Sequence, residues 1–232
     1  MNPSDYNFKL SYFGIAGKAE ALRWAFNYLN IPFEDDLLNG QTFGAKKAAG
    51  EFKFGQVPVL YVWKKSEKFE DAQQLVQSVA IIRFISKLVE KNSFYPSCPI
   101  AAAKVDAILD QEADCFSSYR AVNYKDRNGM KEMSQEEQQK YKTAINNEVI
   151  KSNFEKLEKI LSESSTNWIA GTEGPSIADF FWAASLMAVQ RGWTGDKTVV
   201  EGFPKLNALV DRVLALEEMK EYYKNHEFKI WW

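Results

Sequence analysis

The feature that most constrains this chain is a change of pattern near residue 91. Before that point strand and helix signals alternate, and beyond it no convincing strand is found. Residues 8–12, 33–38 and 57–63 are typical of strands, while apolar residues recur at helical spacing after Gly17 and again over 79–90. The order strand, helix, strand, hairpin, helix predicts a small α/β unit.

The rest of the chain predicts an all-α, helical-bundle unit. Ser134 with Glu137 forms a capping box before one long helix, and Ser176 with Asp179 marks a second helix start before the apolar run 180–189. No internal repeat or low-complexity tract interrupts this pattern. We therefore predict three parts: an α/β domain over 1–91, a Pro-containing linker over 92–99 and an all-helical domain over 100–232.

Composition excludes several classes of function. The 29 Lys and Arg residues nearly balance 31 Asp and Glu residues, which argues against nucleic acid as the main partner. Two cysteines and one histidine provide neither a disulfide framework nor enough soft ligands for zinc, so we expect no metal and a cytoplasmic location. The run 180–189 is too short to span a bilayer and the polar start is no signal peptide, so we expect no membrane association.

Two features of the α/β part are suited to binding a small anion or peptide. Tyr12 ends the first strand just before a helix N-terminus, where a phenol could donate a hydrogen bond to an anion; a tyrosine that simply packs at a strand end is more common. Pro58 opens the clearest strand. A cis bond before it would free the backbone groups of Val57 for an extended peptide, although trans bonds are far more frequent.

Polar residues at helix starts and faces are open to two interpretations. Gln77 and Ser78 could bind a carboxylate or merely cap a helix, and Lys46 and Lys47 could hold a carboxylate or remain solvated. A third group shares one helix face and is by default a solvated acidic stripe, with a divalent ion or a ligand ammonium group as the alternative. Its members are Asp106, Asp110 and Asp114.

Taken together, the order and spacing of these segments resemble the cytosolic glutathione transferases over nearly the whole chain. Within that family they are most similar to the sigma class, because of the Tyr-Phe pair and the Gly-Gln-x-Pro-Val-Leu run. The resemblance is carried by Tyr12-Phe13, KAEALRW at 18–24, FGQVPVL at 54–60, QSVAIIRFI at 77–85 and SIAD at 176–179.

This resemblance implies a thioredoxin-like N-terminal domain and an all-helical C-terminal domain that carries a hydrophobic co-substrate site. It also implies a homodimer, glutathione as co-substrate with no tightly bound cofactor, and conjugation of the glutathione thiolate to apolar electrophiles in detoxification. Tyr12 would match the catalytic tyrosine that hydrogen-bonds the glutathione sulfur. A glutathione-dependent isomerase of the prostaglandin D synthase type and a non-catalytic ligand carrier are the alternatives.

The resemblance assigns the ends of glutathione to particular residues. Lys18 takes the place of a basic residue near the start of the first helix. Phe43 and Lys47 would match a Trp-x-x-x-Lys pair, in which the Lys contacts the glycyl carboxylate. Asp114 would match an acidic residue that reaches across the dimer to the γ-glutamyl amine of the partner's glutathione.

The middle of the tripeptide is assigned in the same way. Gln56 belongs to the binding set, and Val57 before a cis Pro58 would pair with the cysteinyl backbone. Gln77 and Ser78 would bind the γ-glutamyl carboxylate. These assignments place three separate segments of the N-terminal domain around one ligand.

The electrophile pocket is less defined by sequence. Phe13, Ile15 and Tyr119 are candidates for lining it, and Trp231 with Trp232 could cover it; core or dimer packing explains each of them equally well. The chain also departs from the sigma pattern. Ala16 stands where many members carry an Arg that steers the tyrosine and thiol, Phe43 lacks an indole N–H, and about two extra residues precede Gln56.

Overall fold

The computed structural model describes residues 1–91 and 93–226, and it divides into two compact units. One unit is Met1–Tyr95 with Ala215–Trp232, and the other is Pro96–Leu214. The sequence predicted that all of 100–232 belongs to the helical domain. In the structure the chain from Ala215 onward groups with the first unit instead. Helix α10 (Glu217–Asn225) joins the first unit because it packs on α1 (Glu20–Tyr28) through contacts described below.

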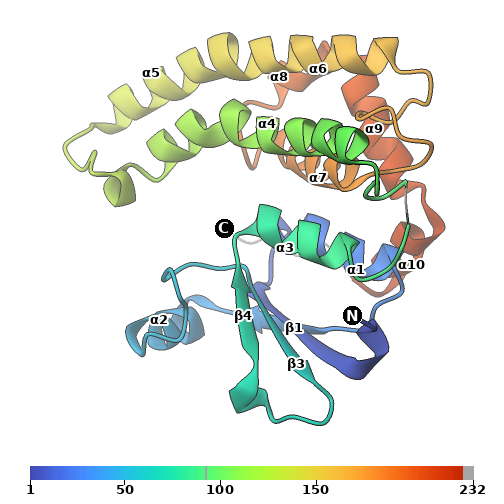
Figure 1. Ribbon diagram of the computed structural model, residues 1–232. Coiled ribbons are helices and arrows are strands. Elements are labelled where there is room, and N and C mark those ends of the chain that lie inside the picture. Colours follow the sequence, from blue (N-terminus) through green and yellow to red (C-terminus); the bar gives the residue numbers. More distant parts are fainter. Residues whose placement is uncertain (92, 227–232) are drawn as a thin grey trace. The chain divides into compact units, whose positions relative to one another are not determined.

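A four-stranded sheet forms the centre of the first unit, in the order β2-β1-β3-β4 (Figure 1). Strand β1 pairs in parallel with β2 and antiparallel with β3, and β3 pairs antiparallel with β4. This is the predicted α/β, thioredoxin-like arrangement of a β-α-β half followed by a hairpin and a helix. The strands are β1 (Tyr6–Phe13), β2 (Glu34–Leu38), β3 (Val59–Lys64) and β4 (Gln73–Val76).

The helices of this unit form for different reasons. In α1 the apolar spacing read from the sequence is the buried face, with Leu22 and Phe26 fully buried. Helix α3 (Ser78–Ser86) buries Ile81, Ile82 and Ile85 in the same way. The sequence did not predict α2 (Gly40–Ala48), because none of its residues is buried and it has no apolar stripe. An Asn39–Thr42 capping box starts it instead.

The second unit is all-helical, as predicted. Helix α7 (Ile177–Gln190) lies in the hydrophobic core of this unit. Its Phe180 and Trp182 are fully buried, and the Trp182 indole N–H donates to the Ile108 carbonyl at 2.6 Å. The predicted long helix after Ser134 is one continuous helical run with a π-helical turn over Asn146–Ile150. The helices are α4 (Pro99–Asn123), α5 (Gln135–Ile145), α6 (Lys151–Glu163), α7 (Ile177–Gln190), α8 (Thr198–Glu201) and α9 (Pro204–Leu214).

Both predicted capping boxes are present. The box at Ser134 is exposed, whereas the one at Ser176 is buried, with Asp179 accepting from the Ser176 N–H at 2.8 Å and from the Ile169 N–H at 2.7 Å. Burial raises the pKa of Asp179 to about 6, against the opposing effect of these donors. Among the described residues, none of the helices combines the length and apolarity that crossing a membrane requires.

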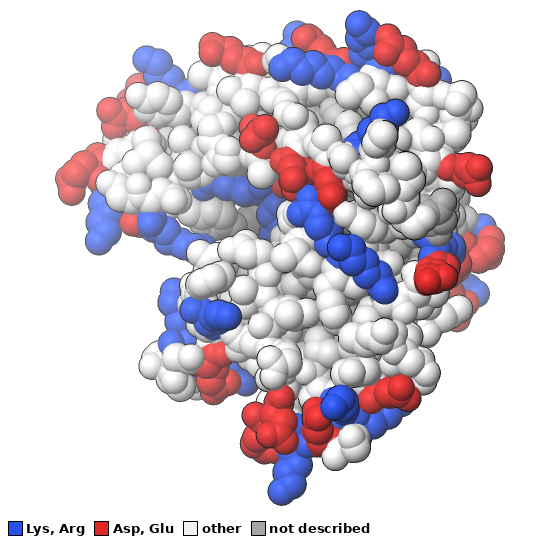
Figure 2. Space-filling view, viewed as in Figure 1, with Lys and Arg blue, Asp and Glu red and all other residues white. Residues whose placement is uncertain are grey.

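Acidic and basic side chains are mixed over the face of the surface in Figure 2, in keeping with the formal net charge of −2. The sheet and its helices bring the candidate site together in the first unit, beside the end of β1.

Candidate functional site

Tyr12 lies at the end of β1 and is 8% exposed. Its phenol oxygen accepts the backbone N–H of Lys18 at 3.1 Å. Gly17 has φ +43°, and a Cβ built on it would lie 2.5 Å from that oxygen. The turn after β1 therefore needs glycine at this position, because the backbone passes directly against the phenol.

Buried Arg23 holds the same turn from the other side. Its guanidinium, 3% exposed as a residue, donates to the carbonyls of Phe13 at 3.1 Å and Ile15 at 2.7 Å. It also pairs with Glu20 at 3.2 Å and with Asp35 at 2.9 Å. Burial opposes the charge of Arg23, but Asp35 and Glu20 together raise its pKa, so the cation persists.

A cavity of about 160 Å³ collects the binding residues that the sequence proposed from distant segments. It is too small for a whole drug-sized ligand, so it suits one part of an extended molecule. Six of its eight lining residues are in the predicted binding set, and the Val57–Pro58 bond is cis, which confirms the implied isomer. The lining residues are Lys18, Phe54, Gln56, Val57, Pro58, Val76, Gln77 and Ser78.

The N-terminus of α3 is suited to binding an anion. Gln77 precedes the helix with φ +73°, a conformation that non-glycine residues adopt rarely and that clusters at functional sites. Its side chain does not cap the helix. The first backbone N–H groups of α3, beginning at Ser78, lie at the positive end of the helix dipole and have no acceptor within the helix. A carboxylate bound at this end would satisfy those donors.

Phe43 and Lys47 lie one turn apart on α2, with the Lys47 Nζ 5.8 Å from the Phe43 ring. The Lys47 stem passes Gly55, where an added Cβ would be 3.4 Å from Cε. Lys47 is thus beside the segment that leads into the cavity. The ring of Phe43 packs 5.1 Å from Phe13 and 5.6 Å from Phe52, so it attaches α2 to the unit's core.

Comparison with known proteins identifies the fold that carries this arrangement. A family model described as "Glutathione S-transferase, C-terminal domain" matches residues 114–226. The chain is 27% identical over 220 residues to glutathione S-transferase S1 of Drosophila melanogaster, across 95% of this chain and 79% of that protein. It is 28% identical over 214 residues to the hematopoietic prostaglandin D synthase of Gallus gallus, across 90% of this chain and 92% of that protein.

The chain belongs to the glutathione S-transferase family. A solved structure, described as monomeric Na-GST-3 of Necator americanus, is 28% identical and superposes with a TM-score of 0.71, covering 97% of this chain and 100% of the other. The named relatives are sigma-class-like, which agrees with the class that the N-terminal motifs resemble.

The residues proposed for the electrophile pocket of this glutathione S-transferase fall in both units. Phe13 and Ile15 belong to the first unit and are half-buried; the Phe13 ring packs 5.6 Å from the ring of Tyr12. Tyr119 belongs to α4 of the second unit, where burial raises its pKa and a hydrogen bond with the backbone of Gly195 lowers it. Phe13 and Tyr119 thus each have a partner within their own unit, and the pocket assignment stays a prediction.

The acidic stripe lies along α4, with Asp110 and Asp114 exposed. Over residues 1–91 and 93–226, no group of three or more His, Cys, Asp or Glu side chains could hold a metal ion. The role of Asp114 across a dimer stays a prediction. Trp231 and Trp232, proposed to cover the site, lie outside the described residues.

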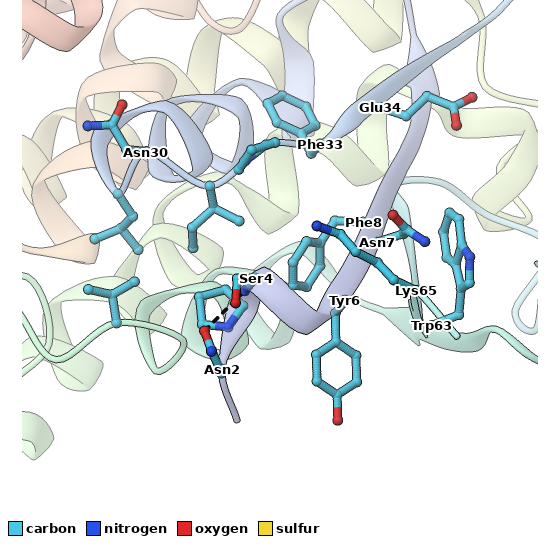
Figure 3. A pocket seen from close by; sticks show the side chains of 15 residues that line it. Asn2, Ser4, Tyr6, Asn7, Phe8, Asn30, Phe33, Glu34, Trp63 and Lys65 are labelled. Carbon is cyan, nitrogen blue, oxygen red and sulfur yellow. Dashed lines mark hydrogen bonds between the residues drawn. The ribbon is translucent and has the colours of Figure 1, made fainter. Parts of the chain in front are cut away.

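A second cavity, of about 600 Å³, lies at the opposite end of β1 from Tyr12 (Figure 3). Its walls come from the start of β1, the turn after α1 and the end of β3, and Figure 3 shows Phe8, Phe33 and Trp63 among them. None of the residues that the sequence proposed for the site lines it. The cavity beside Gln77 is therefore the one that matches the sequence.

The groups that support Tyr12 were not predicted from the sequence. Glu20 and Arg23 lie in the motif at 18–24 but carry no role there, and the motif does not indicate that Gly17 lies against the phenol. The available signal was an i, i+3 pair of opposite charges at positions that the apolar spacing of the helix would bury.

Proposed function

We propose that this glutathione S-transferase conjugates the glutathione thiolate to apolar electrophiles in the cytoplasm, with Tyr12 as its catalytic residue. The observation that carries the proposal is the cavity in which Lys18, Gln56–Pro58 and Gln77–Ser78, from three separate segments, line one space. These are the segments that the resemblance to glutathione transferases assigns to glutathione.

The chemistry needs a thiolate at neutral pH. A free thiol with a pKa of about 8.5 is only about 3% ionised at pH 7. A hydrogen bond donated by the Tyr12 hydroxyl to the sulfur favours the charged form. The Lys18 N–H directed at the same oxygen polarises the phenol and makes it a stronger donor. A shift of two pKa units would raise the thiolate to about 75%, a differential stabilisation of about 2.7 kcal/mol.

The remaining residues orient the tripeptide so that its sulfur meets Tyr12. Gln77 and Ser78 at the start of α3, where backbone N–H groups donate, bind the γ-glutamyl carboxylate. The Val57 backbone pairs with the cysteinyl residue, and Lys47 binds the glycyl carboxylate. The thiolate then attacks an electrophilic carbon held beside it. A C–S bond forms while the bond from that carbon to a leaving group, such as the halide of an aromatic halide, breaks and the halide departs to solvent. Catalysis on this account comes from proximity and electrostatic stabilisation, and no protein nucleophile is consumed.

The proposal includes a homodimer in which Asp114 reaches the amine of the partner's glutathione. Exposure of Asp114 on α4 supports this role. Sedimentation of the purified chain at micromolar concentration measures the assembly state. A monomer that still conjugates glutathione would remove the role of Asp114 and leave that of Tyr12.

An isomerase that regenerates glutathione is the second candidate. It is favoured by the 28% identity to a protein named hematopoietic prostaglandin D synthase. Ala16, which replaces an arginine found in many sigma members, argues for weaker or different thiolate support. Assaying an aromatic halide and a prostaglandin endoperoxide side by side, with the products identified, separates the two activities.

The decisive test uses full-length protein eluted from a glutathione-affinity matrix. Tyr12→Phe removes one hydrogen bond to a charged acceptor, so the conjugation rate should fall about 10- to 150-fold, equivalent to about 1.5–3 kcal/mol. A full rate in Tyr12→Phe would refute the role of Tyr12. Failure of the wild-type chain to bind the matrix would favour a non-catalytic relative.

A further inference from the structure

The last described helix is linked to the turn after Tyr12 by a buried chain of polar contacts. We propose that Tyr223 of α10 is a positioning residue that, through Glu20 and Arg23, holds this turn against the Tyr12 hydroxyl. This inference rests on the proposed function for its catalytic consequence. Its structural part, the dependence of the turn on α10, can be measured without any ligand.

The first link joins α10 to α1. The Tyr223 hydroxyl donates to Glu20 Oε1 at 2.7 Å and accepts the indole N–H of Trp24 at 2.7 Å. The rings of Tyr223 and Trp24 also pack edge to face, with centroids 6.4 Å apart. One phenol thus contacts two residues on α1, and one of them is a carboxylate that is 3% exposed.

The second link joins α1 to the turn. Glu20 Oε2 pairs with Arg23, and Arg23 in turn donates to the carbonyls of Phe13 and Ile15. These carbonyls precede Gly17, whose backbone passes against the Tyr12 hydroxyl, and Lys18, whose N–H donates to it. Hydrogen bonds or ion pairs therefore link Tyr223 to Glu20, Glu20 to Arg23 and Arg23 to the turn, and the backbone from Ile15 to Lys18 completes the path to the phenol.

The charges explain why Tyr223 matters. One guanidinium, Arg23, faces two carboxylates, Glu20 and Asp35, in a buried cluster, so a neutral donor is needed to complete the solvation of Glu20. Burial first and Glu20 second raise the pKa of Tyr223, so its hydroxyl keeps its proton and stays a donor. Tyr222, next along α10, also faces Glu20 and has its pKa raised by burial and by that carboxylate.

Loss of the Tyr223 hydroxyl should redirect Glu20 toward Arg23 or toward water. Arg23 would then share its donors differently between Glu20 and the turn carbonyls, and the turn would loosen. The Tyr12 hydroxyl would lose part of its alignment on the sulfur. We therefore expect a smaller effect than removing the Tyr12 hydroxyl itself, and one that shows in the ionisation of the bound thiol.

The experiment compares Tyr223→Phe with Tyr28→Phe in the full-length chain. Tyr28 is a matched control, because it is a phenol on α1 with 7% exposure that packs against Phe94, outside the network. Hydrogen exchange of the backbone amides of residues 13–19 should become about 3- to 10-fold faster in Tyr223→Phe alone. The pH profile of kcat/KM should shift to higher pH by about half a unit in the same variant.

The outcomes are separable. Unchanged exchange over 13–19 in Tyr223→Phe, or an equal increase in both variants at equal loss of thermal stability, would overturn the inference by showing a merely structural role. A wild-type chain that neither binds nor conjugates glutathione would overturn the proposed function and the catalytic consequence. Faster exchange together with the shifted pH profile in Tyr223→Phe alone would support both parts.

Discussion

The two ends of the candidate glutathione site are built in opposite ways. At the turn after Tyr12 the supporting groups are buried. One residue, Arg23, makes hydrogen bonds or ion pairs with three elements: the turn, α1 and β2. On α2 no residue is buried, and Lys47 lies exposed beside the Phe43 ring. The turn around Tyr12 is specified by many partners, whereas α2 is attached mainly by one aromatic side chain.

This difference corresponds to the task that the proposed function gives to each end. Stabilising a thiolate requires a donor placed to within a fraction of an ångström, and buried pairs supply that constraint. Attracting an exposed carboxylate requires only a nearby positive charge, which contributes little and tolerates motion. We therefore expect changes around Tyr12 to affect stability and turnover, and changes on α2 to affect binding alone.

The largest effect is expected from Arg23→Ala. It leaves Glu20 without its buried cation and removes the donors to the turn carbonyls, so the free energy of unfolding should fall by about 3–5 kcal/mol. Urea denaturation measures it. Lys64→Ala, which removes an exposed ion pair with Glu67, is the control and should cost less than 1 kcal/mol. Equal decreases in the free energy of unfolding in the two variants would contradict the proposed difference between the buried and the exposed ion pair.

Gly17→Ala is expected to come second. The methyl group would meet the Tyr12 oxygen at 2.5 Å, and a positive φ costs a non-glycine residue roughly 1–2 kcal/mol. Displacing the phenol should lower kcat for conjugation about 10-fold or more. Gly129→Ala is the matched control, because Gly129 also has a positive φ of +78° but no atom lies within 4 Å of a Cβ added there. It should lose stability and keep kcat, and an equal kcat loss would contradict the close-approach argument.

The smallest effect is expected from Lys47→Ala. An exposed charge pair contributes about 0.2–1 kcal/mol, so KM for glutathione should rise about 1.5- to 5-fold while kcat stays constant. Lys46→Ala is the control, because Lys46 already pairs with Glu51 at 2.9 Å. Steady-state kinetics at low salt would measure both variants. A fall in kcat for Lys47→Ala would show that α2 also takes part in the chemistry.

Much of this architecture follows from local patterns. Apolar spacing located α1 and α3 because each buries one face, and an unbroken apolar run located α7 because that helix is buried on nearly all sides. Capping boxes located the starts of the helices after Ser134 and Ser176, because their side chains satisfy backbone donors nearby. Helix α2 was missed because nothing on it is buried. The membership of α10 was missed because it depends on Tyr223 meeting Glu20, 203 residues away in the chain.

The candidate site shows the same division. Family motifs indicated Tyr12, Gln77 and the cis bond at Val57–Pro58, and the structure places the residues from 56 to 58 and from 77 to 78 around one cavity. The supports of Tyr12 were not foreseen. Buried charges such as Arg23 are assigned a role only when their partners are known, and those partners lie on other elements.

The division of the chain into units also has a consequence for biosynthesis. Domains tend to fold as units while the chain emerges from the ribosome, N-terminal part first. Here the first unit includes a helix that follows the whole helical unit in the chain, so it is made only after that unit. A nascent chain that has released residues 1–95 still lacks the phenol that completes the surroundings of Glu20, so this buried network can form only after the helical unit has been synthesised.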